Sequence, residues 1–141
     1  MRIVRIICFN HKAEILMVEP LKRLGVFELP GGKVKRSETD IAGIIRESFE
    51  EVGIEIVEDN LREIYRLVDY DFPCTNRIHY SMTCYVNTQV VTVEPKSTKT
   101  DEIRTIAWFD PQKICSCNVD YRSKRFALRY WRSLKKYCSH S

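Results

Sequence analysis

The sequence lacks any long apolar run. A membrane-spanning helix requires about 20 consecutive apolar residues, and no stretch of this chain of 141 residues approaches that length. The apolar residues at the start of the chain are followed at once by Asn10, His11 and Lys12, so they are too few for an export leader. We therefore expect a strand at residues 2–9, no membrane partner, and a protein of the cytoplasm.

The sequence also lacks a pair of Cys-x-x-Cys knuckles, the usual mark of a structural zinc site. It contains six cysteines, of which Cys115 and Cys117 are the closest pair. Without an export signal, a disulfide framework is not expected either. The cysteines are therefore interpreted as free thiols without a metal-binding or disulfide role.

No internal repeat or low-complexity linker divides the chain. Hydrophobic residues make up 44% and charged residues 30% of the composition, which excludes a disordered or membrane-embedded protein. A chain of 141 residues has the usual size of one domain with its own core. We expect a single domain that spans residues 1–141.

Apolar periodicity predicts an α/β (α+β) fold in which a mixed sheet lies between helices. The runs at 2–9 and 14–19 resemble a hairpin pair, because only a short polar stretch separates them. One helix is predicted to begin near residues 37–40 and to end near residue 53, and a second is predicted at about 121–137. Further β-prone segments occur at residues 27–29, 63–72, 77–88 and 103–109.

The first helix carries three glutamates on one side. At about 100° per residue, Glu47, Glu50 and Glu51 share an arc of roughly 100°. The apolar residues that include Ile45 and Phe49 fall on the opposite side, so the wheel predicts that the acidic face is not the core face.

Carboxylates this close repel one another, by about 3 kcal/mol per pair at ~5 Å and an effective dielectric constant of ~20. A cation is expected between them. Mg²⁺ and Mn²⁺ take oxygen ligands, and Mg²⁺ commonly completes its shell with substrate phosphate. Arg46, with Glu38 eight residues before it, is expected to orient these carboxylates.

On composition alone, the glutamates would be an ordinary solvated helix face. Their surroundings favour a site instead, because Pro30, Gly31 and Gly32 precede the helix and glycine lets the main chain approach a ligand closely. Ser37, Thr39 and Asp40 are candidate caps for the start of the helix, and Gly53 is a candidate stop.

This unit of bend, helix and glutamates resembles the Nudix box, the signature of the Nudix hydrolase family. Ser48 departs from the pattern, which usually has an aliphatic residue there; its angle on the wheel lies at the edge of the packing face, away from the carboxylates. The positions that match are Gly32, Glu38, Arg46, Glu47, Glu50, Glu51, Gly53 and Ile54.

The resemblance, most of all to the MutT-like enzymes, implies an α/β/α sandwich with a mostly antiparallel sheet and a Mg²⁺-dependent attack on a phosphoanhydride. It implies that Glu47, Glu50, Glu51 and the Gly31 carbonyl bind the metal, with Mn²⁺ as an alternative ion. Glu47 would be the general base or its partner. Because other members draw the base from a later loop, Glu102 is a candidate for a further ligand or base.

The substrate is specified outside the box. The net charge of +4 suits a polyanionic ligand, and Lys33 is a candidate phosphate contact. Resemblance ranks nucleoside triphosphates first, with release of pyrophosphate and a monophosphate, dinucleoside polyphosphates second and nucleoside diphosphate sugars such as ADP-ribose third. Candidate contacts to the base are Phe27, Tyr70, Asn118 and Asp120, although strand aromatics usually pack inward.

An RNA-binding surface is a less favoured alternative, and capped RNA 5′ ends are also Nudix substrates. The last helix interleaves cations with aromatic residues, a pattern that RNA-binding surfaces use, but an amphipathic helix packed on the sheet gives the same pattern. The sequence leaves the oligomeric state, monomer or homodimer, undecided. The cations are Arg122, Lys124, Arg125, Arg129, Arg132, Lys135 and Lys136.

Overall fold

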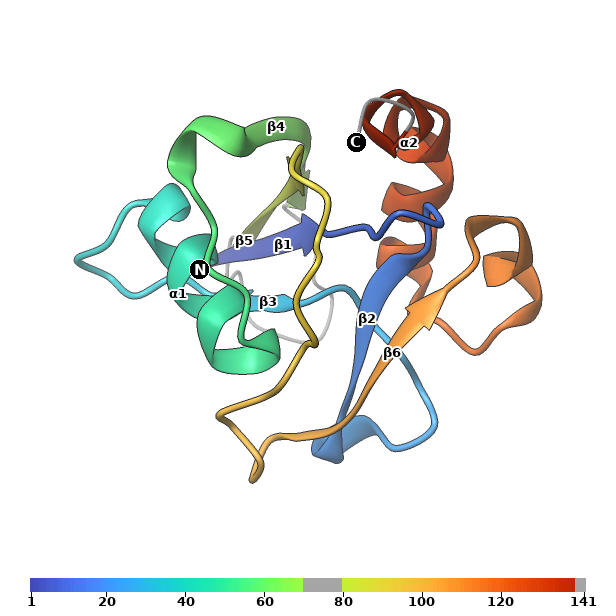
Figure 1. Ribbon diagram of the computed structural model, residues 1–141. Coiled ribbons are helices and arrows are strands. Elements are labelled where there is room, and N and C mark those ends of the chain that lie inside the picture. Colours follow the sequence, from blue (N-terminus) through green and yellow to red (C-terminus); the bar gives the residue numbers. More distant parts are fainter. Residues whose placement is uncertain (70–79, 139–141) are drawn as a thin grey trace.

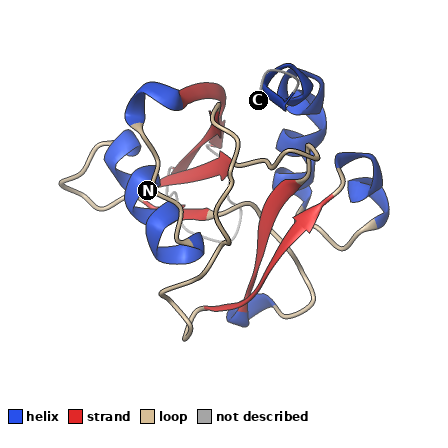
Figure 2. Ribbon diagram, viewed as in Figure 1, coloured by secondary structure: helices blue, strands red, loops and turns tan. Residues whose placement is uncertain are grey.

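The computed structural model describes residues 1–69 and 80–138. Two α-helices lie on either side of a central sheet (Figure 1). Figure 2 distinguishes the helices, the strands and the loops between them by colour. The strands are β1 (Arg2–Ile7), β2 (Ile15–Pro20), β3 (Gly31–Lys33), β4 (Leu61–Asp69), β5 (Tyr80–Asn87) and β6 (Ile103–Phe109). The helices are α1 (Asp40–Val52) and α2 (Tyr121–Cys138), with 3₁₀ turns η1 (Leu21–Arg23), η2 (Glu58–Asn60) and η3 (Pro111–Ser116).

The central sheet has the order β3-β1-β5-β4. Strand β1 runs parallel to β5 and antiparallel to β3, and β4 runs antiparallel to β5. Strands β2 and β6 form a second, antiparallel sheet of two strands. The prediction of a mixed, mostly antiparallel sheet between helices is confirmed.

The two faces of β1 contribute to two separate apolar clusters. Val4 and Ile6 pack with Ile44 of α1, whereas Ile7 packs with Phe126 of α2 on the other side. Alternate residues of a strand point to opposite faces, so the apolar run of β1 supplies both clusters. Among the described residues, no helix is long and apolar enough to cross a membrane.

The predicted hairpin-like pair of residues 2–9 and 14–19 forms only next to its turn, where the Leu16 N–H donates to the Cys8 carbonyl at 3.0 Å. A single bridge between Phe9 and Ile15 connects the two runs, and β2 pairs instead with β6 over its whole length. All six residues of β2 are buried, and a distant strand satisfies its backbone groups. Short sequence separation was a poor guide because strand pairing depends on tertiary context.

Helix α1 begins and ends at predicted residues. The Thr39 hydroxyl accepts a hydrogen bond from the Ala42 N–H at 3.1 Å, which satisfies a donor that the first turn leaves unpaired. Gly53 ends the helix with a left-handed φ of 70°. A side chain on Gly53 would place its Cβ 2.5 Å from the Lys96 carbonyl oxygen, so only glycine fits this position.

Candidate active site

The acidic face of α1 is turned toward the sheet, which corrects the helical-wheel prediction. Glu47 and Glu51 are only 6% and 7% exposed, while Phe49 of the predicted packing face is 49% exposed. Ser48 is also fully buried, and its hydroxyl donates a hydrogen bond to the Ile44 carbonyl at 2.7 Å. The wheel treated carboxylates as solvated groups, but here hydrogen bonds and ion pairs compensate for their burial.

Strand β3 forms the wall opposite the glutamates. The expected bend is confined to Pro30, and Gly31 and Gly32 continue as strand. Gly31 has a φ of 147°, and a Cβ there would lie 1.9 Å from the Val4 carbonyl oxygen. A Cβ on Gly32 would lie 2.9 Å from the Glu47 carboxylate. The two glycines therefore let β3 approach β1 on one side and the carboxylate on the other.

Arg46 holds the carboxylates from one side. Its guanidinium donates two hydrogen bonds to Glu38, at 2.7 and 3.2 Å. The same group donates to Glu47 at 3.0 Å and to Glu50 at 3.1 Å. The hydrogen bond from Arg46, followed by that from the Lys35 N–H, lowers the pKa of Glu38 to about 2. The predicted neighbourhood of Arg46 and Glu38 is therefore present.

Lys99 contacts the same group of carboxylates. Its Nζ lies 2.9 Å from Glu50, 3.5 Å from Glu102 and 3.8 Å from Glu47. The hydrogen bond from Lys99 lowers the pKa of Glu50. Burial disfavours the charged ammonium, but the bond to Glu50 and the charges of the three glutamates outweigh it and raise the pKa of Lys99.

Glu51 is a buried carboxylate of the site, 7% exposed. Its Oε1 accepts a hydrogen bond from the Gly31 N–H at 2.8 Å. Burial raises the pKa of Glu51 to about 7. The hydrogen bond from Gly31 and the charge of Arg5 lower this pKa, whereas the charges of Glu47 and Glu28 raise it further. This side chain can therefore change its protonation state near neutral pH.

Arg5 and Glu28 belong to the site, although the sequence analysis did not single them out. The Arg5 guanidinium donates to the Leu29 carbonyl at 3.0 Å and lies 3.5 Å from the Glu28 carboxylate. Each is a charged residue within an otherwise apolar stretch. A charged residue inside a buried apolar stretch is costly unless it has a partner. This pattern in the sequence could therefore have indicated that Arg5 and Glu28 are paired in the interior.

The carboxylates open into a cavity of about 520 Å³. Of the predicted site residues, Gly31, Lys33, Glu47, Glu51 and Glu102 line it. Glu50 and Arg46 reach the same group through the contacts above. Both cations and acids line this cavity, and the lining residues that carry charge are Arg5, Lys22, Glu28, Lys33, Glu47, Glu51, Lys99, Asp101 and Glu102.

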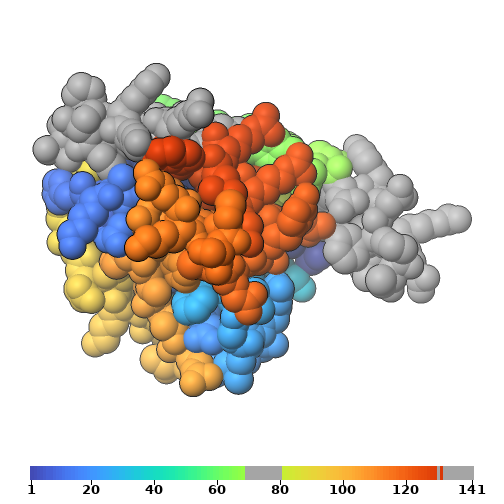
Figure 3. All heavy atoms as spheres, turned by 90° about the vertical axis from the view of Figure 1, so that its right-hand side faces the viewer, coloured from blue at the N-terminus to red at the C-terminus, as the bar shows by residue number. Residues whose placement is uncertain are grey.

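The other predicted substrate contacts lie outside the residues that line this cavity. Phe27 donates its N–H to the Asn118 carbonyl at 2.9 Å and packs edge-on against Phe109, with ring centroids 5.0 Å apart. The Asn118 amide donates to the Gly25 carbonyl at 2.6 Å. Asp120 pairs with Arg23 at 3.1 Å. These contacts join the segment after β2 to the segment before α2 (light blue and orange in Figure 3). Tyr70 lies outside the described residues.

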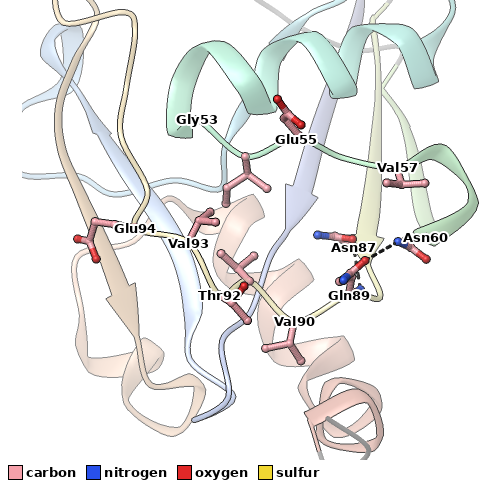
Figure 4. A pocket seen from close by; sticks show the side chains of 12 residues that line it. Gly53, Glu55, Val57, Asn60, Asn87, Gln89, Val90, Thr92, Val93 and Glu94 are labelled. Atoms are coloured by element: carbon pink, nitrogen blue, oxygen red, sulfur yellow. Dashed lines mark hydrogen bonds between the residues drawn. The ribbon is translucent and has the colours of Figure 1, made fainter.

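A second cavity, of about 400 Å³, lies beyond the end of α1. Figure 4 shows its lining, in which the Asn60 amide donates to Gln89 at 2.9 Å. Gln89 in turn donates its backbone N–H to Asn87 at 3.3 Å. Valines, amides and the carboxylates of Glu55 and Glu94 line this cavity, but none of the three box glutamates does. The first cavity is therefore the candidate active site.

The first cavity suits a hard divalent cation. Within the described part of the chain, no three acidic, histidine or cysteine side chains are already gathered as a ligand set. However, Glu47 and Glu51 are buried carboxylates whose oxygens face a cavity next to glycine backbone. Oxygen donors of this kind are those that Mg²⁺ and Mn²⁺ prefer, so the residues fit the ion that the Nudix resemblance implies.

The chain is similar to several known proteins. Over 70 residues it is 36% identical to an 8-oxo-dGTP diphosphatase of Proteus vulgaris, a match that covers 48% of this chain and 60% of that protein. The chain thus spans less than two thirds of the length of this relative.

Two solved structures share the fold. The MutT protein of Methanosarcina mazei Go1 has a TM-score of 0.75 at 22% identity, with 94% of each chain covered. The NUDIX domain of Shewanella oneidensis NrtR, solved with ADP ribose, has a TM-score of 0.76 at 13% identity and covers 95% of this chain and 88% of its own. The NUDIX domain family itself matches residues 1–133. With Gly32, Glu47 and Glu51 of the box lining one cavity in this fold, the chain belongs to the NUDIX domain family.

Proposed function

We propose that this protein is a Mg²⁺-dependent hydrolase that converts a nucleoside triphosphate to a nucleoside monophosphate and pyrophosphate. The observation that carries the proposal is the cavity that Glu47 and Glu51 line together with Lys33 and Arg5. Carboxylates for a divalent cation beside cations for phosphate are the two requirements of phosphoanhydride cleavage.

Glu47, Glu50, Glu51 and the Gly31 carbonyl would hold the Mg²⁺, or Mn²⁺ in its place. When bound, the ion supplies positive charge that neutralises the phosphate oxygens of the substrate. Arg46 keeps Glu47 and Glu50 in a fixed relation to each other, since its guanidinium contacts both.

Two residues are proposed for the proton transfer from the attacking water. Glu47 is the first, because it is buried and lines the cavity. Glu102 is the second, and its side chain is 58% exposed at the rim. Arg5, Lys22 and Lys33 are proposed to contact the phosphates, which orients the chain of phosphorus atoms along the cavity.

The 8-oxo-dGTP diphosphatase of Proteus vulgaris supports a nucleoside triphosphate as the substrate. Phe27, Asn118 and Asp120 are proposed to read the base, since they meet on one side of β2; Tyr70 is retained as a proposed contact. The ADP ribose of the NrtR domain favours a nucleoside diphosphate sugar as the alternative, and a dinucleoside polyphosphate remains a further candidate.

RNA is the less favoured partner. Phe126 of α2 packs inward, and the guanidinium groups of Arg125 and Arg129 lie over the Tyr65 ring, 5.7 and 4.7 Å from its centroid. Phe126 therefore offers no free face for stacking, and both arginines contact an aromatic ring of the protein itself. We further propose a single domain over residues 1–141 that acts in the cytoplasm as a monomer or homodimer.

A substrate panel tests this proposal. The purified protein with Mg²⁺ is incubated with ordinary and oxidised nucleoside triphosphates, dinucleoside polyphosphates, ADP-ribose and capped RNA. Pyrophosphate and monophosphate release are measured separately. Pyrophosphate from a triphosphate is the expected result, whereas preferential production of AMP and ribose 5-phosphate from ADP-ribose would overturn it.

A further inference from the structure

The Lys99 ammonium lies among three carboxylates of the site, those of Glu47, Glu50 and Glu102. Its Nζ lies 2.9 Å from the Glu50 carboxylate and within 3.8 Å of that of Glu47. The side chain is 26% exposed, so solvent does not fully screen these contacts. An ammonium at this distance neutralises part of the repulsion within the acidic cluster.

The backbone of Lys99 is fixed to the end of α1. Thr98 donates both its N–H and its hydroxyl to the Glu50 carbonyl, each at 2.9 Å. Lys96 donates its N–H to the Val52 carbonyl at 2.8 Å, and the Lys99 N–H binds the Ser97 hydroxyl at 3.0 Å. The Lys99 side chain therefore can turn away from the carboxylates without the loop leaving the site.

The local charges do not balance. Glu38, Glu47, Glu50 and Glu102 are the carboxylates in contact with Arg46 or Lys99, which are the two cations of the cluster. Within these six side chains the negative charges exceed the positive ones by two, and a divalent cation supplies that amount. Arg46 binds Glu38 with two hydrogen bonds, so Lys99 is the cation that is easier to displace.

We infer that Lys99 is a displaceable counter-cation: it positions Glu47, Glu50 and Glu102 before a divalent cation binds, yields them to that cation, and then pairs with the substrate phosphates. The inference rests on the proposed function, since it assigns a positioning role at the same site. Its consequence is thermodynamic coupling, because a phosphate that receives the displaced ammonium makes cation binding more favourable.

The test compares Lys99→Met with Lys99→Arg and with Lys96→Met. Lys96 is in the same loop, is exposed, and makes no ion pair with any described residue, so it is the matched control. Mn²⁺ binding is measured by calorimetry or by the resonance signal of unbound Mn²⁺, first alone and then with a non-hydrolysable α,β-imido nucleoside triphosphate.

Lys99→Met is expected to bind Mn²⁺ alone roughly three- to tenfold more tightly than the wild type, as loss of a competing, partly exposed ion pair predicts. Lys99→Arg and Lys96→Met should resemble the wild type. The analogue should increase Mn²⁺ affinity by a smaller factor in Lys99→Met than in the other proteins.

Equal Mn²⁺ affinity of Lys99→Met and Lys96→Met would overturn the inference. So would a Lys99→Met protein that binds the analogue and in which the analogue increases Mn²⁺ affinity by the same factor as in the wild type. Failure of the proposed function is recognised separately. In that case the wild type releases no pyrophosphate from any triphosphate, while the measurements with Mn²⁺ alone still decide the role of Lys99.

Discussion

Glu51 links the stability of the metal-free protein to pH. Burial raises its pKa from 4.5 to about 7, so between these two values the folded chain holds a proton that the unfolded chain has released. Stability therefore falls as the pH rises through this interval. At ~1.4 kcal/mol per pKa unit, the loss is about 3 kcal/mol by pH 8, or roughly 10 °C in Tm for a chain of this size.

The substitution Glu51→Gln removes this titration and retains an oxygen for the Gly31 N–H. In EDTA, the Tm of the wild type should fall between pH 5 and pH 8 relative to that of Glu51→Gln. Glu50→Gln is the control, because the pKa of Glu50 is lowered by Lys99 and its contribution to stability is lost as the pH falls. The Tm of Glu50→Gln should therefore still fall between pH 5 and pH 8, as that of the wild type does.

In the proposed site, Mg²⁺ would compete with the proton for the Glu51 carboxylate, so the apparent Mg²⁺ affinity of the wild type should rise between pH 6 and pH 8. The assay is thermal unfolding followed by circular dichroism, with and without Mg²⁺. Parallel pH profiles for the wild type and Glu51→Gln in EDTA would refute the reasoning.

Three further substitutions test the supports of the site. Gly32→Ala places a Cβ 2.9 Å from the carboxylate of Glu47, so turnover should fall about 100-fold through misplacement of that carboxylate while Tm changes little. Unchanged turnover, or a large drop in Tm, would contradict this. Glu38→Gln weakens the two hydrogen bonds that orient Arg46 and should lower the apparent Mg²⁺ affinity about tenfold or more, as read from the Mg²⁺ dependence of the rate. Gly53→Ala strains a φ of 70° against the Lys96 carbonyl and should cost about 1–3 kcal/mol in urea denaturation, a cost that Lys96→Met does not share.

The sequence predicted those features of the fold that depend on local chemistry. Thr39 and Gly53 cap α1 as expected, because capping depends on residues within one turn of the helix end. The segment at 103–109 forms β6 with the predicted bounds. The partner of β2 was not predictable in this way, since β6 lies far along the chain and pairing depends on the assembled core.

The candidate site was predicted only in part, for a similar reason. Spacing along one helix was enough to group Glu47, Glu50 and Glu51. It did not indicate that Glu47 and Glu51 would be buried, because that depends on how closely the glycines of β3 approach. Arg5 and Lys99 come from distant segments and reach the site only through the sheet and the loop before β6.

The most direct test of the central claim is the turnover of Glu50→Gln and Glu51→Gln at saturating Mg²⁺, on the triphosphate that the wild type hydrolyses best. We expect each substitution to lower kcat by at least about 100-fold, since each removes an oxygen charge that would hold the metal against the transferring phosphoryl group. Near wild-type turnover of both variants would contradict the assignment of this cavity as the active site.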